Sequence, residues 1–335
     1  SDVYKRQIKN NGGDKSYDCI IGISGGTDSS FLLHIAHQYG LRPLAVYLDN
    51  GWSSEISVSN IKKMTDALKI DLQTYVIDYN EIKDILKSYM KAGLPWIDGP
   101  TDIAIRGCLY RIAAREKIKY ILLGSDFRSE GKQPREWTYS DGKQLKYIGG
   151  KFGTVPLKTF PNYTLSNMLF YSFIKWIKVI SPFYFLEYNK EDAQKLLESR
   201  YGWRYYGGHH HESAFTKFVV SYWLPKKFKI DKRKITLSAQ IMSGHITREQ
   251  AIAALNESPY DKEQMENDKE FVIKKLGLTP DEFKKIWNSP NRTFLDYPSY
   301  YPFLEKILTG MNFIIRLFLK EKPLLFYELE IRKNT

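Results

Sequence analysis

Seven residues near the N-terminus, Ser24-Gly-Gly-Thr-Asp-Ser-Ser30, follow directly on the apolar run Cys19–Ile23. The run predicts a β-strand, and an amphipathic pattern over 28–39 predicts a helix that begins inside the polar stretch. The first backbone N–H groups of a helix have no partner within it, and the helix dipole favours an anion there. The junction therefore predicts a phosphate site.

The residue types of this loop suit a phosphate ligand. Gly25 and Gly26 have no Cβ, so the backbone can approach the ligand closely. An acid at Asp28 in an anion site indicates that a cation such as Mg²⁺ accompanies the phosphate. The alternative is a glycine- and serine-rich turn that only caps the helix. We expect ligand contacts from Ser24, Gly25, Gly26, Thr27, Asp28, Ser29 and Ser30, with Ser24 and Asp28 also catalytic.

The loop has neither the lysine of a Walker A motif nor the Gly-x-Gly-x-x-Gly of a dinucleotide site. It resembles instead the Ser-Gly-Gly-x-Asp-Ser loop of the ATP-pyrophosphatase (PP-loop) superfamily. That resemblance implies ATP as the nucleotide, cleavage between its α and β phosphates, and adenylation of a substrate oxygen.

Alternating strands and helices over the first 150 residues predict the scaffold of this loop. Continuous apolar strand runs indicate a parallel sheet covered on both faces, with ligands outside the carboxyl ends of its strands. The expected fold class is α/β, a doubly wound parallel sheet of the adenine nucleotide alpha hydrolase-like type with a mainly helical C-terminal region. The predicted strands are 18–23, 43–48, 72–77 and 120–123, and the predicted helices are 28–39, 55–68, 81–92 and 101–116.

Two further loops should meet the first at the same edge. After the second strand, Asp49 could accept from a ribose hydroxyl or an adenine amine and Gly51 could admit the ligand; an Asx turn is the alternative. After the fourth strand, Asp126 could be catalytic and share Mg²⁺ with Asp28. Arg128 in the same loop could bind the substrate and neutralise negative charge on a phosphate. Gly124 matches the position where related pyrophosphatases pack a glycine against the nucleotide. For the loop after the fourth strand, a connecting loop without a ligand role is an equal alternative.

Basic residues elsewhere are candidates for the substrate. Arg106, expected to be catalytic, and Arg111 lie on the 101–116 helix together with Cys108, which is interpreted as structural. The aromatic, basic stretch 205–217 looks like a substrate-binding segment, and its histidine run His209–His211 lacks the spacing of a metal site. From this stretch and the residues after it we expect substrate contacts from Gly207, Gly208, His209, Lys217, Lys232 and Arg233.

Composition limits the functional classes. Only two cysteines, Cys19 and Cys108, occur in 335 residues, which argues against a disulfide framework and favours a cytoplasmic protein. The formal net charge of +12 could serve nucleic acid, nucleotide-sugar phosphates or an anionic membrane, or could simply be a soluble basic surface. Charged residues interrupt the apolar segments 165–185 and 311–319, so peripheral membrane contact is conceivable there, but a spanning helix is not expected.

The pattern divides the chain into three parts. Residues 1–16 form a partly non-native or truncated segment, because 1–7 reads as translated adaptor sequence and a native stretch could be missing. Residues 17–150 form the nucleotide-binding domain, and 151–335 form a mainly helical substrate- or partner-binding region. No flexible linker marks the boundary near 150.

With these residues in hand, the chain resembles the N-acetyl sugar amidotransferase family from about Tyr17 to Leu255. The combination of motifs carries the resemblance, since the first of them marks only the superfamily. The motifs are residues 17–30, Leu48-Asp-Asn-Gly-Trp52, Thr101-Asp-Ile-Ala-Ile-Arg-Gly-Cys108, Tyr139-Ser-Asp-Gly142, Pro156-Leu-Lys-Thr-Phe160, Tyr205-Tyr-Gly-Gly-His-His-His-Glu212, Tyr222-Trp-Leu-Pro-Lys-Lys-Phe228 and Ile230-Asp-Lys-Arg233.

The resemblance implies an ATP-dependent enzyme of surface-polysaccharide biosynthesis that turns a sugar N-acetyl group into an acetamidino group. It implies a nucleotide-sugar substrate, a separate glutaminase that supplies ammonia, and a cyclase-like barrel subunit. Two alternatives stay open: a tRNA-modifying PP-loop ATPase that forms lysidine or thiolates its target, and a non-catalytic nucleotide-binding module. Missing cysteine pairs weaken the thiolating version, and nucleic acid is not the expected partner.

Overall fold

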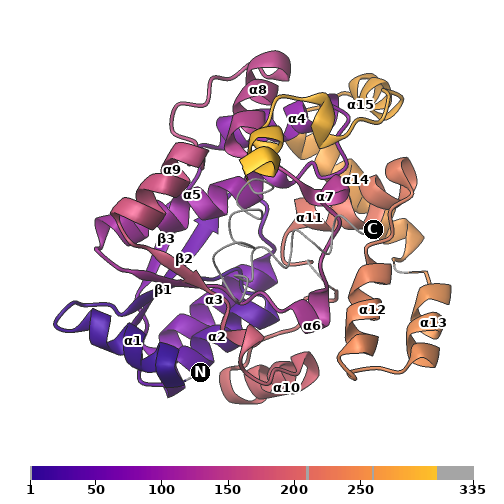
Figure 1. Cartoon of the computed structure of the whole chain (residues 1–335). Helices are drawn as coiled ribbons and strands as arrows, with labels where there is room; N and C mark the ends of the chain where they lie inside the picture. Colours follow the sequence, from indigo (N-terminus) through magenta and orange to yellow (C-terminus); the bar gives the residue numbers. More distant parts are fainter. Residues whose placement is uncertain (1, 209–210, 259, 308–335) are drawn as a thin grey trace.

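The protein is built around a five-stranded parallel sheet with the strand order β3-β2-β1-β4-β5 (Figure 1). The computed structural model describes residues 2–208, 211–258 and 260–307. Four strands confirm those predicted, within one or two residues at their ends. The strands are β1 (Cys19–Gly22), β2 (Pro43–Asp49), β3 (Leu72–Val76), β4 (Tyr120–Leu122) and β5 (Lys178–Ile180).

The fifth strand was not predicted. β5 pairs in parallel with β4, with Lys178 opposite Tyr120 and Ile180 opposite Leu122. It has three residues at the edge of the sheet, and its first two are exposed. A strand this short and this open shows neither the apolar run nor the alternation that sequence reading depends on.

Helices cover both faces of the sheet, so the doubly wound α/β class is confirmed. Along β1, Cys19 and Ile21 belong to the buried cluster that contains α2 and α3, whereas Ile20 belongs to the cluster that contains α5. This alternation is the period-two geometry of a strand buried on both sides. The helices of this part are α1 (Asp2–Gly12), α2 (Thr27–Gln38), α3 (Glu55–Leu68), α4 (Tyr79–Lys91) and α5 (Gly99–Arg115).

The rest of the described chain is mainly helical, as predicted. Capping boxes with Thr247 and Thr279 as N-caps start two of its helices. The elements are α6 (Phe127–Glu130), α7 (Arg135–Thr138), α8 (Gly142–Phe152), α9 (Leu165–Leu169), the π-helix η1 (Phe170–Ile174), the 3₁₀-helix η2 (Pro182–Tyr184), α10 (Lys190–Tyr201), α11 (Ala214–Phe218), the π-helix η3 (Val219–Phe228), α12 (Arg233–Met242), α13 (Arg248–Asn256), α14 (Lys262–Leu276), α15 (Pro280–Trp287) and the 3₁₀-helix η4 (Phe294–Asp296).

Two buried acids of α4 hold the chain after residue 150. The Asp84 carboxylate accepts hydrogen bonds from the backbone N–H groups of Thr154 and Val155, both within 3.0 Å. The Glu81 carboxylate accepts three more backbone N–H groups, from residues 158, 159 and 160. This packing agrees with the lack of a linker near 150, and the division of the chain there stays a prediction.

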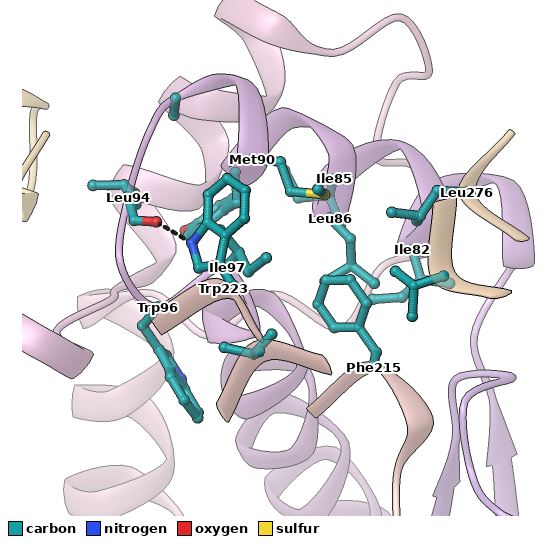
Figure 2. Close-up of a cluster of buried hydrophobic side chains, with 14 of the residues drawn as sticks. Ile82, Ile85, Leu86, Met90, Leu94, Trp96, Ile97, Phe215, Trp223 and Leu276 are labelled. Carbon is teal, nitrogen blue, oxygen red and sulfur yellow. Dashed lines mark hydrogen bonds between the residues drawn. The ribbon is translucent and has the colours of Figure 1, made fainter. Parts of the chain in front are cut away.

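A large apolar cluster joins α4 to the C-terminal helices (Figure 2). Trp223 lies fully buried beside α4, and its indole N–H donates to the Leu94 carbonyl at 3.0 Å. Phe215 packs towards Ile82 and Leu276 in the same cluster. The N-terminal and C-terminal parts therefore share one core.

The aromatic segment 165–185 lies partly on the surface. Phe173 is 62% exposed and Trp176 is 64% exposed, beside the basic residues Lys175 and Lys178. Within the described residues, no helix is long and apolar enough to cross a membrane. Peripheral membrane contact of this segment stays a prediction, and the second candidate segment, 311–319, lies outside the described residues.

Replacing Trp223 tests whether this shared core stabilises the whole chain. We expect Trp223→Ala to lower the free energy of unfolding by about 3–5 kcal/mol, since it leaves a cavity and an unpaired carbonyl. Urea denaturation followed by circular dichroism measures the change. Met242→Ala is the control, because Met242 is 89% exposed and its loss should change stability by less than about 0.5 kcal/mol. Equal effects of the two variants would contradict the assignment.

Candidate active site

The loop between β1 and α2 is held from behind by three groups. Gly25 has a φ of +78°, and a Cβ at this position would lie 2.2 Å from the Ser57 carbonyl oxygen. The Gly25 carbonyl accepts the Trp203 indole N–H at 3.1 Å and the Asn60 amide at 3.3 Å. Only glycine fits this conformation and this space, so the loop is fixed against α3 and its polar groups face away from that helix.

The front of the loop presents donors to an incoming anion. α2 begins at Thr27, and its N-cap residue, Gly26, gives no side-chain cap. The Ser24 hydroxyl lies 3.3 Å from both the Gly26 N–H and the Ser29 hydroxyl, while the Thr27 N–H donates to the Tyr206 hydroxyl at 3.4 Å. These weak, long contacts leave the helix N-terminus available to a phosphate.

A cavity of about 320 Å³ opens at the carboxyl edge of the sheet, beside this loop. We call it the strand-edge cavity. Apolar side chains from β2, α5 and the end of β4 form one part of its wall, and polar groups form the other. Its lining residues are Gly22, Ile23, Ser24, Val46, Tyr47, Leu48, Asn50, Ser53, Trp96, Asp98, Thr101, Asp102, Ile105, Cys108, Leu109, Leu123, Glu212, Ser213 and Thr216.

Two segments far apart in the sequence close this cavity together. Ser53, after β2, forms an antiparallel bridge with Ser213. The Ala214 N–H donates to the Trp52 carbonyl and the Ser54 N–H donates to the Glu212 carbonyl, each at 2.8 Å. The chain that leads into α11 is thereby fixed against the loop after β2.

Buried charges surround Asp28 on the other side of the loop. The Asp28 carboxylate accepts from the Lys190 ammonium at 2.9 Å and from the Tyr188 hydroxyl. Burial raises the pKa of Glu130 to about 7, and the negative charges of Asp28 and Asp126 add to that effect. Burial lowers the pKa of Lys190, but Asp28 and Glu130 outweigh it, so its pKa is raised overall. Three acids and a lysine thus lie close together next to the loop.

The acids near Asp28 could take part in a magnesium site only together with the ligand. No group of three or more His, Cys, Asp or Glu side chains among the described residues could hold a metal ion. Mg²⁺ commonly binds through one or two carboxylates plus phosphate oxygens and water, so these acids fit such a role when a phosphate is present. The shared Asp28–Asp126 site stays a prediction.

The loop after β4 has structural contacts of its own. A Cβ on Gly124 would lie 2.9 Å from the backbone of Asp28, so this glycine allows α2 to pack against the loop. Asp126 caps α6 by accepting the N–H groups of Arg128 and Ser129. The Arg128 guanidinium donates to the Phe183 carbonyl at 2.6 Å. Their predicted roles towards ligand stay predictions.

The loop after β2 forms the alternative predicted for it, an Asx turn. The Asp49 carboxylate accepts the Gly51 N–H at 2.8 Å. Gly51 has a φ of +76°, and its would-be Cβ meets the Tyr79 ring at 3.2 Å. Neither residue lines the strand-edge cavity, whereas their neighbour Asn50 does.

The candidates on α5 face different ways. Arg106 is exposed and lies beyond the strand-edge cavity. Arg111 contacts the Tyr75 hydroxyl and the Phe160 carbonyl, at the far end of the hydrogen-bond range. Cys108 lines the cavity, but burial raises the pKa of its thiol to about 12, so it is not a thiolate nucleophile at neutral pH and its structural interpretation is supported.

The basic candidates from the C-terminal part separate clearly. Lys217 pairs with Asp268 at 2.6 Å, and Arg233 pairs with Asp231 at 2.8 Å, both outside the strand-edge cavity. Lys232 lies over the Trp96 ring, with its ammonium 4.3 Å from the ring centre. Of the remaining candidates, Gly207 (φ +90°) has open space around it, Gly208 packs against the His211 ring, and His209 lies outside the described residues.

Sequence reasoning missed an acidic end of the cavity. Thr216 donates to the Asp98 carboxylate at 2.6 Å, and burial, followed by Asp102, raises the pKa of Asp98 to about 7. The Asp102 carboxylate accepts the Trp96 indole N–H at 2.7 Å. Burial lowers the pKa of Lys232, which Asp102, Glu130 and Asp98 partly oppose. Asp98 precedes the helix predicted over 101–116, and the signal that could have found this end is the occurrence of Trp96, Asp98 and Asp102 within seven residues.

The sheet and the Ser24–Ser30 loop at the end of its first strand define a doubly wound α/β protein with a phosphate-type loop. Residues 212–308 match the family described as LPS biosynthesis protein WbpG-like, C-terminal domain. We call the matched region the WbpG-like domain after this similarity, and it begins at Glu212, which lines the strand-edge cavity. No curated protein matches the chain.

Three solved structures show a weak similarity to this chain. The U34-tRNA thiolase NcsA from Methanococcus maripaludis, with its 4Fe-4S cluster, is 17% identical with a TM-score of 0.34, covering 73% of this chain and 80% of its own. The NMN synthetase from Francisella tularensis is 18% identical with a TM-score of 0.30, covering 61% of this chain and 87% of its own. The NH3-dependent NAD synthetase from Campylobacter jejuni is 16% identical with a TM-score of 0.32, covering 78% of this chain and 94% of its own. At these values the function has to be argued from the site itself.

The raised pKa of Glu130 predicts a pH-dependent stability. From about pH 4.5 to about pH 7 the folded protein keeps a proton that the unfolded chain has lost, so this group makes stability fall as the pH rises through that window. Glu130→Gln should therefore resist urea better than the wild type at pH 8, with an advantage that shrinks towards pH 5.

Urea denaturation of both proteins at pH 5 and pH 8 checks this expectation. Glu136→Gln is the matched control, because Glu136 is exposed on the neighbouring helix α7. An advantage of Glu130→Gln that is the same at both pH values would show that Glu130 is ionised in the folded protein at pH 5.

Proposed function

We propose that this protein is an ATP-dependent, AMP-forming amidotransferase that converts an N-acetyl group of a sugar, carried by a nucleotide, into an acetamidino group. The observation that carries the proposal is that the phosphate-type loop and the WbpG-like domain line one cavity. Ser24 comes from the loop, and Glu212, Ser213 and Thr216 come from the domain. A nucleotide bound at the loop would thus meet residues of a domain typical of LPS biosynthesis proteins.

ATP fits this site by size and chemistry. In the proposed pose, the β and γ phosphates lie on the N-terminus of α2 and the adenosine enters the strand-edge cavity. The cavity volume of about 320 Å³ and its apolar wall of Val46, Leu48 and Ile105 suit a purine and ribose. Mg²⁺, held by Asp28 and phosphate oxygens, would supply charge neutralisation for the departing pyrophosphate.

The proposed reaction has two displacements. The acetamide oxygen attacks the α phosphorus of ATP, and pyrophosphate leaves with the electrons of the α–β bridge. Ammonia then adds to the activated carbon, AMP leaves with the former amide oxygen, and a proton is released. Oxygen is thereby replaced by NH, which lowers the acceptor mass by about one dalton.

The chain's own residues would assist by charge and position. The helix N-terminus and Lys190 face the phosphates, where negative charge increases as pyrophosphate departs. Asp98 has a pKa of about 7 and could accept the proton that ammonia loses. Ammonia would come from a glutaminase working with a cyclase-like barrel subunit, as the family resemblance implies.

The decisive experiment incubates the protein with ATP, Mg²⁺, ammonium and a panel of UDP-linked N-acetyl sugars. We expect AMP and a product about one dalton lighter. Ser24→Ala should slow AMP formation about a hundredfold, because it removes a donor next to the phosphates. Chromatography of nucleotides and mass spectrometry of the sugar give both readouts.

Ser199→Ala on α10 is the control variant, because its hydroxyl bonds only within its own helix. ADP in place of AMP, or no acceptor-dependent nucleotide at all, would overturn the proposal. AMP formation that depends on tRNA and not on a sugar would instead support the tRNA-modifying alternative.

A further inference from the structure

A second cavity lies next to the strand-edge cavity and shares one residue with it. Its volume is about 400 Å³, and it lies between α5 and the chain that contains α7. We call it the arginine cavity. Its lining residues are Asp102, Ile103, Arg106, Gly131, Lys132, Gln133, Arg135, Thr138, Tyr139 and Ser140.

Helix α5 separates the two cavities and contributes to both. Thr101, Ile105 and Cys108 face the strand-edge cavity, whereas Ile103 and Arg106 face the arginine cavity. Spacings of three and four residues place each set on one stripe of the helix, so the stripes are neighbours. Asp102 lines both cavities, so they adjoin at this residue.

The charge of the arginine cavity is opposite to that of the acids around Asp98. Arg106 and Arg135 are guanidinium groups that match phosphate oxygens with paired hydrogen bonds, and Lys132 adds a third basic side chain to the lining. The Gln133 side-chain oxygen is buried without a hydrogen-bond partner. Hydroxyls from Thr138, Tyr139 and Ser140 complete a polar wall.

Asp102 is held where the two cavities meet. Its carboxylate accepts the Trp96 indole N–H at 2.7 Å, and the Lys232 ammonium lies over the same indole ring. The positive charge of Arg106 lowers the pKa of Asp102, against the larger effect of burial, which raises it. A ligand that extends from the arginine cavity past Asp102 would therefore pass from basic side chains to the carboxyl groups of Asp102 and Asp98 before it reaches the loop side.

We propose that the arginine cavity binds the diphosphate of the acceptor, with Arg106 and Arg135 as the specificity-determining residues. The neutral sugar then lies past Asp102, with its N-acetyl group directed to the strand-edge cavity. Two guanidinium groups exceed what a single carboxylate needs, which favours a diphosphate over a sugar acid. This inference rests on the proposed function and assigns acceptor binding to residues other than Lys217 and Arg233, whose charges pair with Asp268 and Asp231.

Calorimetric titration with UDP tests the inference without any turnover. The full chain is first saturated with α,β-methylene-ATP and Mg²⁺, so that the nucleotide site is filled. We expect UDP still to bind, inorganic pyrophosphate to compete with it, and glucuronate to bind much more weakly. Arg106→Gln and Arg135→Gln should each weaken UDP binding about tenfold and leave binding of the ATP analogue unchanged.

Arg115→Gln is the charge-matched control on the same helix. Arg115 pairs with Glu116 and Gln73, outside both cavities, so UDP affinity should not change. UDP binding that the ATP analogue abolishes, or that neither arginine variant weakens, would overturn the inference. Glucuronate binding as tightly as UDP would overturn the assignment to a diphosphate.

The same titration separates the inference from the proposed function. If AMP forms with UDP-linked sugars but neither Arg106→Gln nor Arg135→Gln changes the affinity for UDP, the proposed function stands and the arginine cavity is not the acceptor site. If UDP binds through the arginines but no acceptor yields AMP, the cavity stands and the proposed reaction is wrong.

Discussion

The close contact between Gly25 and the Ser57 carbonyl is the constraint on which the site depends. A left-handed φ and a missing Cβ bring the loop against α3, and the Gly25 carbonyl then accepts from Trp203 and Asn60. Because the back of the loop is satisfied by these bonds, its front can present the N-terminus of α2 to a ligand. Preorganisation of this kind lowers the cost of ordering groups when an anion binds. The same contacts attach the loop to residues of the C-terminal part, since Trp203 follows α10.

The WbpG-like domain contributes both to the apolar core and to the strand-edge cavity. Its first residues pair with the loop after β2, and Trp223 and Phe215 complete the cluster on α4. The wall of the strand-edge cavity that contains Glu212 and Thr216 therefore exists only when this core is packed. A loosened core would be expected to impair the site before the sheet itself unfolds.

The sequence was sufficient for the parts of the structure that local patterns encode. The first four strands, the helices around them and the capping boxes at Thr247 and Thr279 follow from hydrophobic period and turn chemistry, which act within a few residues. β5 was not predicted, because it is a strand through its pairing with β4 and not through its own residue pattern. The same holds for the site. The Ser24–Ser30 loop is recognisable from its local sequence, whereas Lys190 and Asp98 are marked only by partners that are distant in the sequence.

Several charged groups with shifted pKa values lie around the loop. Lys190 keeps its proton because Asp28 and Glu130 lie beside it, while Glu130 and Asp98 have pKa values of about 7 and can take up protons near neutrality. Burial pushes Lys232 towards its neutral form. A polyphosphate brought to α2 would reverse that tendency, since its negative charge favours an ammonium at Lys232 and a neutral carboxyl at Glu130. If the proposed function holds, binding of ATP would thus shift protons between groups that are already in place.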